Sequence, residues 1–282
     1  MKNSLMILLV VGLMAGTGCF KHREAPHRPV TASTMTEAVA KKDSVERINL
    51  SGQTLGALPQ ELAAMPKLDE VWLRGCKGLA SLSVLPSIKS LRVLDLSEIQ
   101  LTAVPSDVVG AASLQQLYLA DDGLKSLPSA IGGLSKLNYL NLDRNLLTSL
   151  PPEIGKLTGL RWLRLNNNQL SALPAEVASL KSLQRVYLRQ NRFAAVPESL
   201  KGMALLEDVS LSGNPVSAVP SWMTELPKLR QLDLDGCPVA KLPDNLSGWK
   251  HLQVLSLVRC PIDAAEKARI RAALAPKTHI AF

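Results

Sequence analysis

The stretch LNYLNLDRNLLTSLPPEIGKLTG, residues 137–159, decides the fold of this chain. It follows the pattern LxxLxLxxNxLxxLPxxLxxLxx, and this 23-residue unit runs ten times from residue 45 to residue 274 without insertion or deletion. The units begin at Val45, Leu68, Leu91, Leu114, Leu137, Leu160, Leu183, Leu206, Leu229 and Leu252. A fixed period of this length indicates a solenoid, because one unit can bury its leucines only by stacking on its neighbours.

The first part of each unit predicts a β-strand. Leu140 and Leu142 alternate with polar residues, which is the period of a strand with one buried face. The pair Leu150 and Pro151 then turns the chain back toward the start of the next strand.

The pattern resembles the leucine-rich repeat family over about four fifths of the chain, in the 23-residue form of Ras-group and many bacterial proteins. The resemblance implies an α/β fold: a right-handed, curved solenoid with a parallel β-sheet on its concave face and short helical or irregular segments on its convex face. It also implies that position 9 of each unit hydrogen-bonds the turn from inside.

Position 9 is a column of residues that, except for one isoleucine, are small or polar. It reads Gln53, Cys76, Ile99, Asp122, Asn145, Asn168, Asn191, Asn214, Cys237 and Cys260. An asparagine can both donate and accept hydrogen bonds, as a buried turn requires. Ile99 can make no such bond, so we expect the turn of the third unit to be the weakest locally.

The cysteines of this column are expected to be small buried thiols that replace asparagine. Cys237 and Cys260 occupy the same position in adjacent units, where strands lie about 4.8 Å apart, so a disulfide between them is an alternative in an oxidising compartment. One cysteine per unit without a partnering histidine does not make a metal site. We expect neither a metal nor a cofactor.

Residues 1–18 have the composition of a signal peptide: Lys2, an apolar run over residues 5–14, then small residues. That run is too short for a lasting membrane-spanning helix. Gly18 and Cys19 resemble the end of a bacterial lipobox, although Gly16 departs from the preferred leucine. The resemblance implies lipidation of Cys19 and a membrane-anchored lipoprotein of the cell envelope, periplasmic or surface-facing. Simple secretion, and a retained anchor or a misread start of the chain, are the alternatives.

Residues 19–44 are expected to form a tether and an N-terminal cap. Pro26, Pro29 and mixed charges indicate a tether, in which His22 and His27 are solvated. A short helix over residues 36–42 is expected to cover the first unit.

The tenth unit loses its Leu-Pro pair and is expected to end in a helical cap. Asp263 and Glu266 form a capping box, which predicts a helix over residues 264–274. Alternating residues 278–282 predict a last edge strand within the C-terminal segment 275–282.

Several function classes find no support in the sequence. The net charge of +8 suggests affinity for acidic surfaces, but Lys and Arg are dispersed over the units, so we do not expect a nucleic-acid partner. The repeat region holds only His251, the C-terminal strand adds His279, and neither joins a catalytic set, a phosphate loop or zinc spacing. We therefore do not expect an enzyme.

Positions 3, 5 and 7 of each unit are expected to face the concave side, free of the repeat pattern. All three tyrosines and two of the four tryptophans lie there. Tyrosine, tryptophan and arginine are the side chains that anchor interfaces. The predicted binding residues, here called the concave patch, are Tyr118, Tyr139, Arg144, Arg161, Trp162, Arg164, Arg185, Tyr187 and Arg189. Alternatively, these side chains stack across strands only to cover the sheet.

An acidic zone follows the concave patch. It consists of Glu207, Asp208, Asp233 and Asp235. Such a cluster can bind calcium or do acid and base work. Pairing of Arg185 with Asp208, and of Arg230 with Glu207, is the simpler expectation.

The sequence thus favours a monomeric, exported, lipid-anchored scaffold that binds a protein or peptide on its concave face. Recognition of a glycan or cell-wall polymer is the first alternative, because tyrosine and tryptophan also stack on sugar rings. A structural envelope protein without a dedicated ligand is the second.

Overall fold

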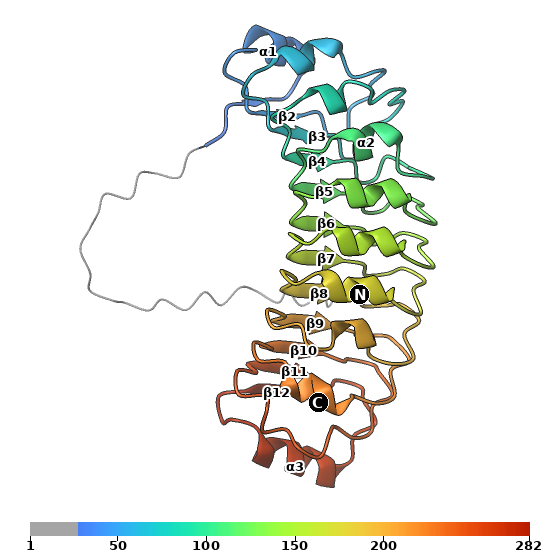
Figure 1. Ribbon diagram of the computed structural model, residues 1–282, viewed down its shortest axis with the longest axis vertical. Coiled ribbons are helices and arrows are strands. Elements are labelled where there is room, and N and C mark those ends of the chain that lie inside the picture. Colours follow the sequence, from blue (N-terminus) through green and yellow to red (C-terminus); the bar gives the residue numbers. More distant parts are fainter. Residues whose placement is uncertain (1–27) are drawn as a thin grey trace, which may run out of the picture.

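Each repeat contributes one short strand, formed by its positions 3 to 5. The computed structural model describes residues 28–282. Twelve parallel strands form one sheet in sequence order (Figure 1). They are β1 (Thr31–Ala32), β2 (Arg47–Asn49), β3 (Glu70–Trp72), β4 (Val93–Asp95), β5 (Gln116–Tyr118), β6 (Tyr139–Asn141), β7 (Trp162–Arg164), β8 (Arg185–Tyr187), β9 (Asp208–Ser210), β10 (Gln231–Asp233), β11 (Val254–Ser256) and β12 (His279–Ala281).

The register of the sheet follows the period of the sequence. Leu140 of β6 pairs with Leu163 of β7, which pairs with Val186 of β8, so equivalent positions lie side by side. These central residues are fully buried, whereas their strand neighbours are at least partly exposed in most repeats. The leucines of all repeats therefore form one continuous core behind the sheet.

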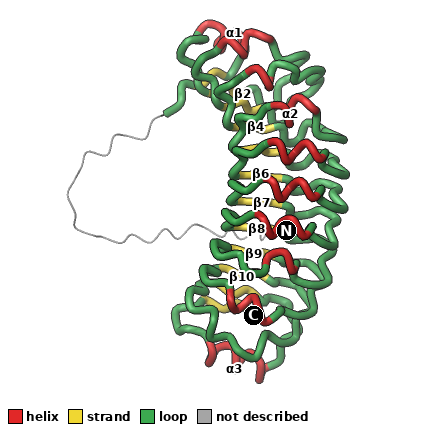
Figure 2. Tube along the Cα trace, in the orientation of Figure 1, coloured by secondary structure: helices red, strands yellow, loops and turns green. Residues whose placement is uncertain are grey.

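Short helical segments cover the opposite side of that core. Figures 1 and 2 show the strands along the inner, concave side of the curved stack and the helical turns along the outer side. They are α1 (Met35–Ala40), η1 (Gln60–Ala64), η2 (Leu85–Ser87), α2 (Ser106–Gly110), η3 (Ser129–Gly133), η4 (Pro152–Lys156), η5 (Ala175–Ser179), η6 (Glu198–Leu200), η7 (Ser221–Glu225) and α3 (Ala264–Ala273). The predicted fold class is confirmed.

Position 8 adopts a left-handed backbone in all ten repeats, which the sequence reasoning missed. The residues are Gly52, Gly75, Glu98, Asp121, Arg144, Asn167, Gln190, Gly213, Gly236 and Arg259, with φ between 52° and 76°. Glycine adopts this conformation without steric cost, but six of the ten are not glycine. The stacked turns must hold these six in place.

The asparagine ladder has the predicted role. Asn145 Nδ2 donates to the Leu119 carbonyl of the preceding repeat at 2.7 Å, and its Oδ1 accepts from the Leu124 amide at 3.1 Å. Asn168, Asn191 and Asn214 repeat both bonds. Each rung therefore joins two successive turns.

The ladder cysteines are free thiols. Each thiol donates to the carbonyl that an asparagine Nδ2 would bind at this position. Sγ of Cys76, Cys237 and Cys260 lies 3.0, 3.3 and 3.2 Å from the equivalent carbonyl of the preceding repeat. Burial raises the pKa of all three thiols, that of Cys260 to about 11. The predicted replacement of asparagine by cysteine in the ladder is confirmed. Within residues 28–282, Cys237 and Cys260 are both free thiols, so the alternative disulfide between them is absent.

Both ends of the solenoid are capped. The predicted N-terminal helix is confirmed as α1, one or two residues earlier than expected. At the other end the Asp263 side chain accepts from the Glu266 amide at 2.7 Å and starts α3. Glu266 Oε1 also accepts from the Leu242 amide at 2.9 Å, so the capping residue itself ties α3 to the preceding repeat.

Candidate binding face

Six of the nine concave-patch residues lie on four neighbouring strands. They are Tyr118 on β5, Tyr139 on β6, Trp162 and Arg164 on β7, and Arg185 and Tyr187 on β8. The other three flank these strands. Arg161 precedes β7 and Arg189 follows β8, while Arg144 occupies the left-handed turn after β6. The patch is therefore an aromatic centre with arginines at its borders.

Four aromatic rings of this face contact one another in a row, tilted by 35° to 60° between neighbours, and we call them the ring ladder. Centroids of Tyr118 and Tyr139 lie 4.9 Å apart, and those of Tyr139 and Trp162 lie 5.6 Å apart. The fourth ring is Trp72 on β3, at 5.7 Å from Tyr118. The contact between Trp72 and Tyr118 passes over β4, because the position-5 residue of that strand is the small, buried Asp95. The predicted concave patch did not include Trp72, although this residue stands in the same position-5 column as Tyr118.

Arginines extend the ring ladder at both ends. The guanidinium carbon of Arg185 lies 4.5 Å from the Trp162 ring centroid, and that of Arg47 lies 5.7 Å from Trp72. Arg164 lies over Tyr187 at 5.3 Å. Each such contact contributes about 0.5–1 kcal/mol at an exposed site. Trp162 is 37% exposed, which makes it one of the few large apolar side chains of the described chain open to solvent.

Aspartates compensate most of the arginine charge. Arg164 and Asp143 form an ion pair at 2.7 Å, and the Asp143 side chain is only 2% exposed. Further pairs join Arg144 to Asp121, Arg185 to Asp208 at 2.9 Å and, more loosely, Arg189 to Asp233 at 3.9 Å. Five patch arginines against these four aspartates leave a formal charge of +1 (+5 − 4). The face is therefore polar but nearly neutral.

Burial holds the tyrosines in their neutral form. It raises the pKa of Tyr139 to about 12 and also raises that of Tyr118 and Tyr187. Burial raises the pKa of Asp208 as well, against the attraction of Arg185. The tyrosine hydroxyls thus act as neutral hydrogen-bonding groups throughout the physiological pH range.

Some concave polar residues support the backbone, contrary to the expectation that this face is free of the repeat constraint. Asn141 Oδ1 at position 5 accepts from the Asp143 amide two residues on, at 3.0 Å. Asp143 at position 7 accepts from the Asn166 amide of the next repeat at 2.8 Å, and Asn166 in turn accepts from the Arg189 amide at 2.9 Å. These short polar side chains form a second ladder, because they reach the amides that the turn leaves unpaired.

The strands after β8 carry small polar side chains at the same positions. We call Asp208, Ser210, Asp233 and Ser256 the small polar zone. Ser210 donates to Asp233 at 2.7 Å, and the predicted pair of Arg185 with Asp208 is confirmed. The predicted pair of Arg230 with Glu207 does not form within residues 28–282. Arg230 instead exerts a longer-range attraction on Asp208. No metal-binding group of His, Cys, Asp or Glu occurs in the described part of the chain.

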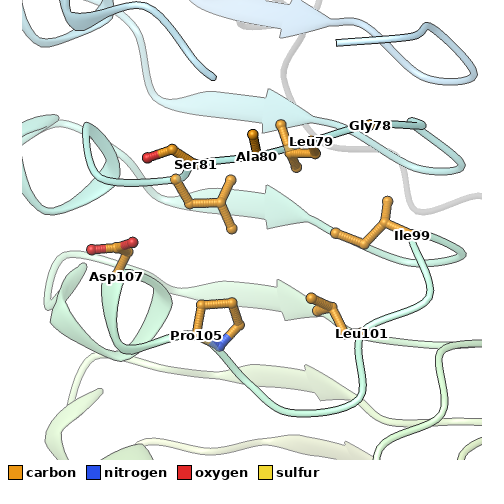
Figure 3. A pocket seen from close by; sticks show the side chains of 9 residues that line it. Gly78, Leu79, Ala80, Ser81, Ile99, Leu101, Pro105 and Asp107 are labelled. Atoms are coloured by element: carbon orange, nitrogen blue, oxygen red, sulfur yellow. The ribbon is translucent and has the colours of Figure 1, made fainter. Parts of the chain in front are cut away.

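A groove of about 350 Å³ opens beside repeats 2 and 3 (Figure 3). It is lined by Gly78, Leu79, Ala80, Ser81, Leu82, Ile99, Leu101, Pro105 and Asp107. Gly78 and Ser81 stand at positions 11 and 14, where the pattern has leucine. The missing side chains explain the groove, which lies away from the concave patch.

Comparison with known proteins supports the same architecture. Residues 130–232 match the family model described as "Leucine-rich repeat region". A leucine-rich repeat protein from Leptospira interrogans is 29% identical, with a TM-score of 0.61 over 86% of this chain and 74% of that one. An internalin from Listeria monocytogenes is 19% identical, with a TM-score of 0.56 over 84% and 80%. The chain folds as a leucine-rich repeat solenoid.

A third similar structure is that of a receptor. The leucine-rich repeat ectodomain of the plant membrane receptor kinase GASSHO1/SCHENGEN3 from Arabidopsis thaliana, solved in complex with Casparian strip integrity factor 2, is 29% identical with a TM-score of 0.62. The match covers 78% of this chain and 28% of the receptor chain. The comparison with curated proteins gave no match. Among residues 28–282 no helix has the length and apolarity to cross a membrane.

Proposed function

We propose that this leucine-rich repeat solenoid is a non-enzymatic scaffold that binds a protein or peptide through its concave patch. The observation that carries the proposal is the ring ladder, which ends at the exposed Trp162 between Tyr139 and Arg185. The core of the solenoid consists mainly of aliphatic side chains and does not depend on these rings. A fixed, partly exposed aromatic and arginine cluster has the composition of an interface hot spot.

The ion pairs favour a partner recognised by stacking and hydrogen bonds. Asp143 and Asp208 fix the guanidinium groups of Arg164 and Arg185, which remain 37% and 35% exposed. A guanidinium has five N–H donors, and one aspartate engages only one or two of them. The remaining donors can bind carbonyl groups of a partner. Because the arginine charge is already compensated, a strongly acidic partner is not required.

Ring geometry favours a protein or peptide over a glycan. Sugar rings stack on open aromatic faces, but the ladder centroids lie only 4.9 to 5.7 Å apart. The rings are tilted to one another by 35° to 60°, and each ring centroid has two ring or guanidinium neighbours within 5.7 Å, so little open ring face is left for a sugar ring. Edges and hydroxyls remain for contacts with protein groups. The receptor ectodomain in complex with a separate factor supports the same choice.

The double variant Trp162→Ala with Arg164→Ala tests the proposal. Pull-down partners from the native cell envelope should fall at least tenfold, because the variant removes two ring contacts and one anchored arginine. The matched control is Gln231→Ala with Ser256→Ala, on the same face outside the patch, which should retain the partners. Unchanged recovery, together with unchanged polymer binding, would show that the patch hypothesis is wrong. Loss of polymer binding alone would instead favour the glycan alternative.

We also propose that the scaffold is exported and lipid-anchored through Cys19, as a monomer. This rests on the sequence of residues 1–19, and Cys19 lies outside the described residues. Radiolabelled palmitate should be incorporated into the wild-type protein and not into Cys19→Ser. Incorporation that persists in the variant would contradict the anchor.

A further inference from the structure

One rung of the ladder carries a carboxyl group where the following four carry an amide. Asp122 stands at position 9 of repeat 4, next to Asn145 in repeat 5. Asp122 Oδ1 accepts from the amides of Ile99 and Leu101 at 3.0 and 3.1 Å. The Leu101 bond is equivalent to the bond of Asn145 Oδ1 with Leu124. The acceptor half of the rung is therefore intact.

The donor half is missing. Asn145 Nδ2 donates to the Leu119 carbonyl, 26 residues earlier in the chain. The atom of Asp122 that corresponds to this amide nitrogen is Oδ2, which is buried and has no hydrogen-bond partner. The carbonyl 26 residues before Asp122 is that of Leu96. In the register of the ladder this carbonyl corresponds to the acceptor of the asparagine rungs, and a carboxylate oxygen cannot donate to it.

We propose that Asp122 is a pH-sensitive rung, which joins repeats 3 and 4 when its carboxyl group is protonated and loosens them when it ionises. A neutral carboxyl group reproduces the asparagine pattern. Its Oδ1 still accepts from the two amides, and Oδ2–H donates to the Leu96 carbonyl. Loss of the proton removes that donor and leaves a buried negative charge.

The direction of titration agrees with this geometry. Burial raises the pKa of Asp122 to about 6 in the folded chain, against its ordinary value of 3.8, although the backbone amides of Leu101, Ile99 and Gln100 oppose the rise. The folded state therefore binds the proton more tightly than the unfolded state. Stability from this group is complete below about pH 4 and is lost as the pH rises through about 6.

Other charged groups around the rung are already paired. Asp121, on the same turn, raises the pKa of Asp122 and forms an ion pair with Arg144 of repeat 5. Glu98 of repeat 3 pairs with Arg74 of repeat 2. Asp143 of repeat 5 pairs with Arg164. Among these four carboxyl groups of the described residues, Asp122 alone has no cationic partner.

The position of the rung gives it a consequence beyond its own turn. On its N-terminal side lies the turn of Ile99, which has no rung side chain and has left-handed residues at both Glu98 and Gln100. Ile99 and Leu101 also line the groove of Figure 3. The contact between Trp72 and Tyr118 bridges repeats 2 and 4 across this turn. Loosening at Asp122 would therefore act on the junction between the first three repeats and the rest.

Hydrogen exchange of the full chain between pH 4 and pH 8 tests the proposal. In the wild type, protection factors of the Ile99 and Leu101 amides should fall as the pH rises through about 6, by up to about 100-fold for a pKa difference of this size. Asp122→Asn supplies a permanent donor and should keep these protection factors constant. The variant should equal the wild type at pH 4 and exceed it at pH 8.

Two further variants separate this rung from general effects of charge. Asn145→Asp places a second carboxyl group at the next rung, and the protection factor of the Leu124 amide should then also depend on pH. Asp121→Asn removes the neighbouring charge but keeps the rung, so the pH dependence at Leu101 should remain. Parallel pH profiles of Asp122→Asn and the wild type, or loss of the dependence in Asp121→Asn, would overturn the proposal.

Discussion

The concave strands β5 to β8 and the following strands β9 to β11 are built on the same backbone but present different surfaces. Asn191 and Asn214 make the same two rung bonds in repeats 7 and 8, and the central strand residues are buried in both regions. The first region carries rings and arginines, and the second carries the small polar zone. The scaffold therefore needs no aromatic side chains on this face, which supports a binding role for those it has.

Removal of a rung should have the largest effect and should be equal in the two regions. Asn168→Ala and Asn214→Ala each remove one bond accepted from a buried amide and two or more bonds donated to carbonyls. We expect each to lower the free energy of unfolding by about 3 kcal/mol, measured by urea denaturation. A decrease in the free energy of unfolding in only one of the two variants would show that the two regions do not share one scaffold.

Removal of a ring should have a smaller effect on stability. Trp162→Ala loses contacts with Tyr139 and Arg185, but the side chain is partly exposed, so we expect a loss of about 1 kcal/mol. The matched change in the small polar zone, Ser210→Ala, should cost a similar amount through its bond to Asp233. A loss above 3 kcal/mol at Trp162 would make the ring ladder part of the scaffold.

Substitutions at position 8 should change the free energy of unfolding in opposite directions in the two regions. Gln190 follows β8 with φ of 52°, and Gly236 follows β10 with φ of 69° and has room for a methyl group. Gln190→Gly should raise the free energy of unfolding by about 0.5–1 kcal/mol, and Gly236→Ala should lower it by about 1 kcal/mol. Thermal unfolding of both variants checks the prediction. Changes of the same sign would show that neighbouring side chains, rather than backbone conformation, decide the cost.

Salt should have the smallest effect. Because the patch arginines are compensated to a formal +1, partner binding should change less than threefold between 50 and 500 mM NaCl at about 25 °C. Surface plasmon resonance with the recovered partner measures this. A tenfold loss would indicate that Arg161 and Arg189, at the borders, dominate recognition through charge.

The sequence predicts the regular part of this molecule because one physical need recurs in every repeat. Leucine spacing gives the parallel sheet, and position 9 gives the asparagine ladder with its cysteine substitutes. The left-handed position 8 escaped prediction because only four of its ten residues are glycine. The glycine signal was too sparse to reveal a shared backbone conformation.

The candidate site was only partly predictable. The composition of the strand positions located the aromatic residues, but not which of them stack. Trp72 joins the ring ladder because the intervening Asp95 of the same position-5 column is small, and this contact between repeats 2 and 4 follows from distances that residue types alone do not give. Likewise, Asp143 and Asn166 look like free surface residues in sequence, whereas they hold amides of the next repeat.

Photocrosslinking in the native envelope tests the central claim most directly, by comparing the two regions of one face. A photoreactive residue replaces Tyr187 in the concave patch or, in a matched variant, Ser256 in the small polar zone. We expect a crosslinked protein or peptide from position 187 and little or none from position 256. Equal crosslinking from both positions, a carbohydrate polymer as the only product, or no product from position 187 would contradict the claim.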